Sequence, residues 1–180
     1  MAVSIGDMVT QTAQRLGVDP TLALEVAIQE SGLNPSARSS AGAIGVMQLM
    51  PQTAAALGVD PTDAQQNITG GITYLKQQLA RFGSVAMALA AYNWGPENVA
   101  KAMASYGANW ASHLPAETSN YITTILSKAG SASQVVFSPV AAAGTLLKQA
   151  ASNLPNDDWK KIALLAGGAV AIYLLADTIE

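Results

Sequence analysis

The chain has 180 residues, of which half are hydrophobic and 12% are charged, and its formal net charge is −3. This length supports one domain with its own core plus an appended segment, and the composition excludes a disordered chain. The small negative charge gives no reason to expect a nucleic-acid partner, and the absence of Cys excludes disulfides and thiolate metal sites.

Residues that start and end helices are frequent in the first part of the chain. The hexapeptide LGVDPT occurs twice, at residues 16–21 and 57–62. In each copy Gly is placed to end one helix, Asp to cap the next, and Pro to take the first helical position. We interpret the two copies as reuse of one kind of helix junction rather than as a repeat architecture.

The spacing of apolar residues predicts a mainly α fold. Ile68, Ile72, Leu75, Leu79 and Phe82 recur at intervals of three and four, which gives one apolar helix face. The Ala-rich segment 84–93 is apolar on nearly all sides, so we expect it to be a buried central helix. No segment alternates convincingly with a period of two, so strands are expected to be few or absent. The predicted helices span residues 4–16, 20–31, 51–58, 68–82, 84–93, 96 onward and 115–130.

Composition changes near residue 130, where we place a domain boundary. Residues 1–130 are predicted to form the helical domain, 131–158 a linker with a weak helix, and 159–180 an apolar C-terminal helix. Residues 162–176 carry no charge, but this run is shorter than the ~20 apolar residues that span a bilayer. Two interpretations stay open: a membrane anchor, or an assembly helix that packs against other subunits or further copies of the chain.

One carboxylate stands out in residues 29–51, QESGLNPSARSSAGAIGVMQLMP, which contain Glu30 but no His, Cys or Lys. Ala23, Val26 and Ala27 precede Glu30 at helical spacing, which places the carboxylate on or beside an apolar face. Burial there would raise its pKa from ~4.3 toward the ~6 that a glycosidase acid needs. By position alone, a solvent-exposed Glu at a helix end is the simpler interpretation.

Four motifs extend this observation. They are QES at 29–31 followed by NP at 34–35, SAGA at 40–43 followed by GVMQLMP at 45–51, AYN at 91–93 followed by GP at 95–96, and LP, ET and YI between 114 and 122. In this order the chain resembles the soluble-lytic-transglycosylase-like domains, which are related to goose-type lysozyme. The resemblance covers about residues 20–126 and departs slightly at Val46, where Leu is usual. It implies a lysozyme-like helical domain.

The resemblance also implies a role for each matching residue. Glu30 is implied as the general acid and then the general base, with Tyr92 placing its hydroxyl nearby. Met47 and Tyr121 have a second interpretation as core residues, since both occur among apolar neighbours. No metal and no cofactor are implied. The implied substrate-binding residues are Ser39 near the acetamido group, Met47 and Gln48 along the cleft, Tyr92, Asn93 holding substrate or the Glu30 loop, and Tyr121 closing the far side.

The expected activity is that of a lytic transglycosylase acting on peptidoglycan glycan strands. Such an enzyme cleaves the β-1,4 bond between N-acetylmuramic acid and N-acetylglucosamine and forms a 1,6-anhydro sugar, so one carboxylate suffices because the substrate supplies its own nucleophile. Glu97 and Glu117 both follow Pro closely and are interpreted as first-turn helix residues. A muramidase on the same fold and a non-catalytic virion subunit remain alternatives.

The setting is predicted from the two ends of the chain. The N-terminal sequence MAVSIGDMVTQTAQRLG lacks the basic and apolar regions of a secretory signal, yet the expected substrate lies outside the cytoplasmic membrane. These features favour a protein that a phage particle carries to the cell wall, located in the virion or at the cell envelope.

Overall fold

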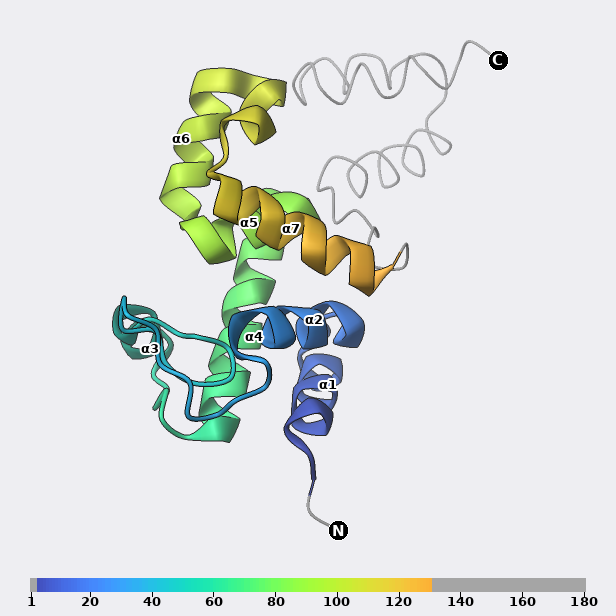
Figure 1. The fold of residues 1–180 in the computed structure, drawn as a ribbon, viewed down its shortest axis with the longest axis vertical. Coiled ribbons are helices and arrows are strands. Elements are labelled where there is room, and N and C mark those ends of the chain that lie inside the picture. The colour runs from blue at the N-terminus through green and yellow to red at the C-terminus, as the bar shows by residue number, and fades with distance from the viewer. Residues whose placement is uncertain (1–2, 131–180) are drawn as a thin grey trace, which may run out of the picture. The chain divides into compact units, whose positions relative to one another are not determined.

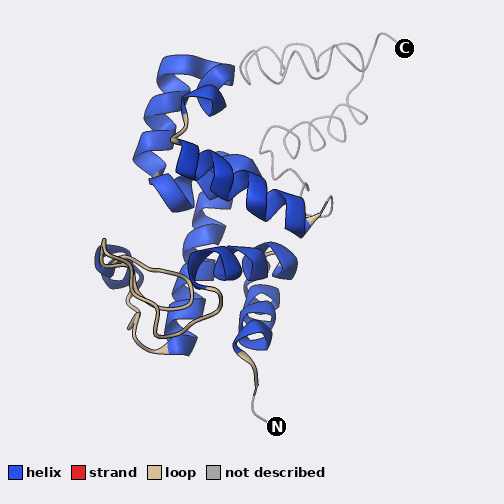
Figure 2. Cartoon of the chain, viewed as in Figure 1, coloured by secondary structure: helices blue, strands red, loops and turns tan. Residues whose placement is uncertain are grey.

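The computed structural model describes residues 3–130, and this part of the chain is helical (Figure 2). Two isolated β-bridges join Ile44 to Arg38 and to Leu49, and no strand forms within residues 3–130. The predicted mainly helical fold is therefore confirmed for this part of the chain. Its elements are α1 (Ile5–Leu16), α2 (Pro20–Ser31), α3 (Pro51–Leu57), α4 (Ala64–Phe82), α5 (Val85–Trp94), α6 (Pro96–Tyr106), the 3₁₀ helix η1 (Gly107–His113) and α7 (Ala116–Ala129).

The first LGVDPT copy forms the predicted junction. Gly17 ends α1 in the left-handed conformation, with φ of 68°, and the Asp19 side chain accepts hydrogen bonds from the backbone of Thr21 and Leu22. Pro20 is the first residue of α2, where its missing N–H has no cost.

The second LGVDPT copy departs from the prediction. Gly58 ends α3 as expected, but Asp60 does not cap α4 and Pro61 does not begin it. The cap is Asp63, which accepts from the backbone N–H of Gln66. The difference has a local cause. The Asp60 carboxylate accepts from the backbone N–H and the hydroxyl of Thr62, and the Asn67 side chain donates to the Pro61 carbonyl.

The helices pack around α4 and α5 (Figure 1). The long helix α4 contacts α1, α3 and α5, and α5 contacts α6 and α7 as well. Residues Val85, Ala88, Leu89, Ala90 and Ala91 of α5 are buried, as predicted for the central Ala-rich helix. Because α7 also packs against α2, it links the helix that carries Glu30 to the helix that carries Tyr92 and Asn93.

The predicted linker 131–158 and apolar helix 159–180 lie outside the described residues. Within residues 3–130, no helix combines the length and apolar character that crossing a membrane requires.

Candidate active site

Glu30 is the penultimate residue of α2, which ends at Gly32 with a left-handed φ of 62°. Ala23, Val26 and Ala27 on the same helix are fully buried, and the Glu30 side chain itself is partly buried. The helical spacing therefore places the carboxylate at the border of the apolar core, as the sequence predicts. This position removes the carboxyl group from much of its hydration without sealing it from solvent.

The electrostatic setting of Glu30 favours its neutral form. Burial raises its pKa from 4.5 to about 7, and this desolvation outweighs every other influence. The hydroxyl of Tyr121 donates to Glu30 Oε1 at 2.6 Å, which lowers the pKa, while the negative charge of Glu117 raises it. Near neutral pH the group can therefore release a proton and take one back, which suits a general acid–base residue.

Two tyrosines flank this carboxyl group. Tyr121, 5% exposed, bonds to Glu30 directly, a contact that sequence reasoning did not predict. The hydroxyl of Tyr92 donates instead to the carbonyl oxygen of Met47 at 2.9 Å, although the charge of Glu30 still raises the pKa of Tyr92. Burial is the main reason that the pKa of both phenols lies well above its ordinary value, so both remain hydrogen-bond donors at neutral pH.

The loop that carries Met47 and Gln48 is held by a residue that sequence reasoning missed. Asn67 of α4 is fully buried. Its Oδ1 accepts from the Met47 N–H at 2.8 Å, and its Nδ2 donates to the carbonyls of Ile44 and Pro61 at 2.8 and 3.0 Å. A polar residue within the apolar face of α4 was the available signal, because a buried amide needs such partners.

Met47 occupies the core rather than the cleft surface. Its side chain is fully buried and lies against α4 at Gly71, where a Cβ atom would overlap the Cβ of Met47. The implied cleft-lining role therefore does not fit its side chain, and the contribution of Met47 to the site is the carbonyl oxygen that fixes Tyr92. Ser31, next to Glu30, also holds this loop, since its hydroxyl donates to the Val46 carbonyl at 2.8 Å.

Gln48 and Asn93 line a cavity of about 280 Å³. Gln48 has an unfavourable φ of 46°, and its Nε2 donates to the Gly45 carbonyl at 2.8 Å. Tyr92 lines the same cavity, and the charge of Glu30 raises its pKa. Tyr92 is therefore the lining residue that lies within electrostatic reach of the carboxyl group. Met50, Thr53, Tyr74 and Trp94 are further lining residues.

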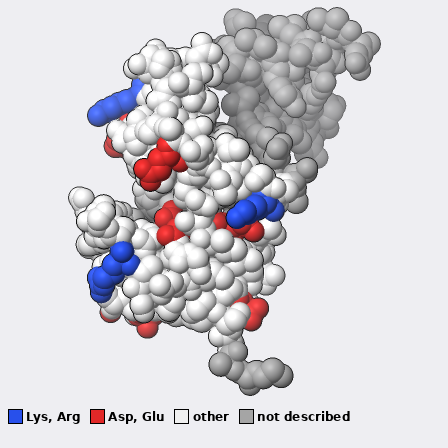
Figure 3. Space-filling model, in the orientation of Figure 1, with Lys and Arg blue, Asp and Glu red and all other residues white. Residues whose placement is uncertain are grey.

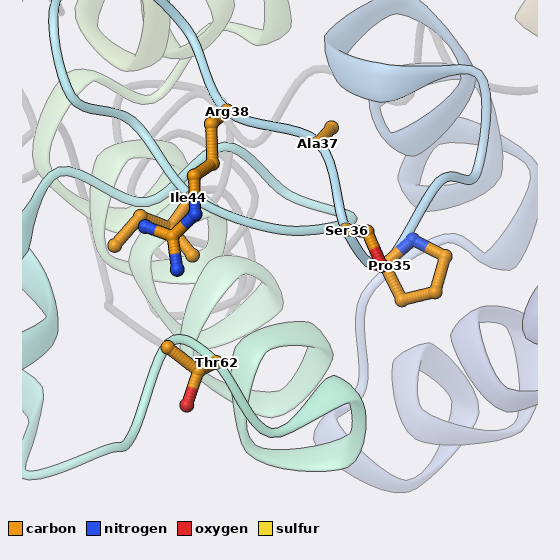
Figure 4. A pocket seen from close by; sticks show the side chains of 6 residues that line it. All are labelled: Pro35, Ser36, Ala37, Arg38, Ile44 and Thr62. Atoms are coloured by element: carbon orange, nitrogen blue, oxygen red, sulfur yellow. The ribbon is translucent and has the colours of Figure 1, made fainter.

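Ser39 is not among the residues that line this cavity. It is exposed, and its Oγ accepts from the Ala43 N–H at 3.0 Å. A second cavity of about 170 Å³ lies in the same loop region. Figure 4 shows Arg38 reaching along it toward Ile44 and Thr62, with Pro35 and Ser36 at its other side. The second cavity contains none of the predicted site residues.

A metal centre has no basis in the described part of the chain, where no three His, Cys, Asp or Glu residues lie close enough to hold an ion. Charged side chains are few and scattered on the face seen in Figure 3. The chemistry that the carboxyl group of Glu30 offers is proton transfer.

Comparison with known proteins identifies the family to which the chain belongs. The model of the transglycosylase SLT domain family matches residues 7–114. A transglycosylase of Enterobacteria phage PRD1 is 39% identical over 79 residues, which is 43% of this chain and 30% of the relative. Membrane-bound lytic murein transglycosylase F of Desulfosudis oleivorans is 35% identical over 96 residues, 49% of this chain and 21% of the relative.

Solved structures agree with this match. The 70-kDa soluble lytic transglycosylase of Escherichia coli superposes with a TM-score of 0.62 at 28% identity, covering 68% of this chain and 23% of that one. A 70-kDa soluble lytic transglycosylase in complex with bulgecin A gives a TM-score of 0.63 at 26% identity, covering 68% of this chain and 23% of that one. An inactive mutant of the lytic transglycosylase Slt from Pseudomonas aeruginosa gives 0.60 at 29% identity, covering 68% and 22%. The chain spans less than a third of the length of each of these proteins.

Proposed function

Because the chain belongs to the transglycosylase SLT domain family, we propose that it is a peptidoglycan lytic transglycosylase with Glu30 as its catalytic residue. The observation that carries the proposal is the carboxyl group of Glu30, whose pKa is raised to about 7 by burial and which accepts a hydrogen bond from Tyr121. A carboxyl group in this state can act first as an acid and then as a base at neutral pH.

The first step is protonation of the leaving group. Glu30, in its neutral form, gives its proton to the glycosidic oxygen between N-acetylmuramic acid and N-acetylglucosamine as the bond from that oxygen to C1 breaks. The carboxylate that forms is stabilised by the Tyr121 hydroxyl, which already lies 2.6 Å from Oε1. The acetamido group of the muramic acid stabilises the electron-poor C1.

The second step uses a nucleophile from the substrate itself. The Glu30 carboxylate removes the proton of the 6-hydroxyl of the same muramic acid, and that oxygen bonds to C1. The product is 1,6-anhydro-N-acetylmuramic acid, Glu30 regains its proton, and no water is consumed. Attack within one ring needs no second protein carboxylate, because the reacting atoms are already held together.

The cavity lined by Gln48, Tyr92 and Asn93 is proposed to hold the glycan. Gln48 and Asn93 supply polar groups there, and Tyr92 connects this wall to the carboxyl group. Ser39 is retained as a proposed contact at the exposed end of the loop, and Tyr121 holds the carboxyl group from the side of α7. The residues that line the cavity carry no charge, which suits a sugar chain, because such a chain is recognised by hydrogen bonds and ring contacts rather than by ion pairs.

A muramidase is the second candidate, because one observation favours it. Glu117 on α7 lies near enough to raise the pKa of Glu30 through its charge, and it is exposed, so it could activate a water molecule. In that case the site would contain the two carboxyl groups of an ordinary glycosidase.

Digestion of purified peptidoglycan by the wild type and by Glu117→Gln separates the two candidates. We expect muropeptides lighter by one water from both proteins in mass spectrometry, because Glu117 takes no part in transglycosylation. Removing its negative charge lowers the pKa of Glu30, so the fall of kcat/KM with rising pH is expected at a lower pH in the variant.

Ordinary reducing ends that disappear in Glu117→Gln would establish hydrolysis instead. No cleavage by the wild type under any condition would favour the non-catalytic subunit.

The proposed biological role is local penetration of the cell wall by a phage particle. The relative from phage PRD1 supports this setting, with the envelope of a bacterium as the alternative suggested by the membrane-bound relative. Residues 131–158 are proposed as the linker, and 159–180 as the anchor or assembly helix. Mass spectrometry of purified particles is expected to detect the chain, and its presence only in the host envelope would exclude the virion role.

A further inference from the structure

Thr118 and Asn93 form a partly buried polar contact that the mechanism above does not use. Thr118 stands in the first turn of α7 and is 2% exposed. Its hydroxyl donates to Oδ1 of Asn93, near the end of α5, at 2.8 Å. The contact joins the helix that holds Glu30 through Tyr121 to a residue that lines the 280 Å³ cavity.

This contact determines which way the amide of Asn93 faces. Because the oxygen accepts from Thr118, the nitrogen Nδ2 occupies the other branch of the planar amide and points away from that hydroxyl. Nδ2 makes no hydrogen bond to the described residues. Within residues 3–130, the buried side-chain nitrogens and oxygens without a partner include only Gln78 Oε1, so Nδ2 is reached by solvent. It is a free donor on a residue that lines the cavity.

We propose that Thr118 is a positioning residue for substrate binding: its hydroxyl holds the Asn93 amide so that Nδ2 donates to an acceptor oxygen of an N-acetylated sugar in the cavity. This inference rests on the proposed function. The face of α7 then serves two parts of the site at once, since Thr118 orients a substrate donor and Tyr121, three residues later, holds the acid. Without the Thr118 hydroxyl, the amide of Asn93 could turn over. In part of the molecules its oxygen would then face the sugar, and the hydrogen bond from Nδ2 would be lost.

Binding is measured in the full chain with Glu30→Gln, so that the ligand is not consumed. The probe is a soluble, uncross-linked glycan of alternating N-acetylglucosamine and N-acetylmuramic acid, titrated by calorimetry. Thr118→Val keeps the side-chain shape but removes the hydroxyl, and it is expected to weaken binding about tenfold, the effect of one lost hydrogen bond in such a site. Thr118→Ser restores the hydroxyl and is expected to bind within about twofold of its parent.

Asn93→Asp is the decisive companion variant, because it keeps the acceptor for Thr118 and removes the donor. We expect it to lose about tenfold in affinity with its thermal midpoint preserved, which a purely structural role would not produce. It also tests the inference if Thr118→Val fails to fold. Unchanged affinity in either folded variant, or no rescue by Ser, would overturn the inference. A failure of the proposed function looks different, since the wild type would then leave peptidoglycan intact while these binding differences could still be measured.

Discussion

Glu30→Gln is expected to lower kcat/KM for peptidoglycan by a factor of about 10² to 10⁴, the range that a positioned general acid supplies. Gln has nearly the same shape and keeps an oxygen that can accept the hydrogen bond from Tyr121, but it has no proton to give to the glycosidic oxygen. The rate of release of soluble muropeptides from purified sacculi measures the loss. Activity within a few fold of the wild type would remove Glu30 from the mechanism.

The same substitution is expected to stabilise the fold at high pH, which separates lost chemistry from lost structure. The folded-state pKa of Glu30 is raised from 4.5 to about 7, so the folded protein holds this proton more tightly than the unfolded chain does. The wild type therefore loses stability as pH rises between these two values, and the Glu30→Gln variant avoids the loss because its amide does not ionise.

The size of this effect follows from the pKa difference. A shift of this size corresponds to at most about 3 kcal/mol, because one pKa unit is about 1.4 kcal/mol. Denaturant unfolding at pH 8 should show the variant more stable by up to that amount, with no advantage near pH 4. A variant that is less stable at pH 8 would mean that contacts stabilise the ionised form.

Gly71→Ala is expected to lower the free energy of unfolding by about 3 kcal/mol, at the upper end of the cost of overpacking. A Cβ atom at Gly71 would overlap the Cβ and Cγ of Met47, and the Cβ is bonded to the backbone, so no side-chain rotation moves it away. The loop must then shift and weaken the hydrogen bond between Met47 N–H and Asn67. Urea unfolding of the wild type and the variant measures the change.

Gly6→Ala is the matched control, since Gly6 also lies in a helix. Its added Cβ would meet Leu24 Cδ1 at 3.7 Å, an ordinary contact, and Ala favours the helix by about 0.5–1 kcal/mol over Gly. The two substitutions should therefore have opposite signs. Equal small effects would show that the loop and α4 are not closely packed at Gly71.

The helices could be predicted because their signals are local. Ser4 with Asp7, Asp19 with Pro20, and the glycines that end α1, α2 and α3 act within a few residues, so the sequence shows them directly. The second LGVDPT copy failed for the complementary reason. The side chain of Asn67, which follows the hexapeptide, donates to the Pro61 carbonyl and holds the segment in a turn. A contact to a residue outside the hexapeptide leaves no mark within it.

In the candidate site, too, local features could be predicted from the sequence and contacts between distant residues could not. Glu30 could be placed beside an apolar face from helical spacing, and Gln48, Tyr92 and Asn93 from the resemblance. The hydrogen bonds that Glu30 and Asn93 accept could not be predicted, because Tyr121 lies 91 residues from Glu30 and Thr118 lies 25 residues from Asn93. Which hydroxyl meets which acceptor depends on how α7 packs across α2 and α5, and periodicity gives the buried face of a helix but not its partner.

The three hydrogen bonds of Asn67 also determine how the loop moves. The amide of Met47 belongs to no helix or strand, yet it donates to a buried side chain of α4, so it can exchange with deuterium only when that contact opens. Its exchange should therefore follow the slow amides of α4 rather than those of an ordinary loop. The wall of the cavity at Gln48 is then held as firmly as the helix α4 behind it.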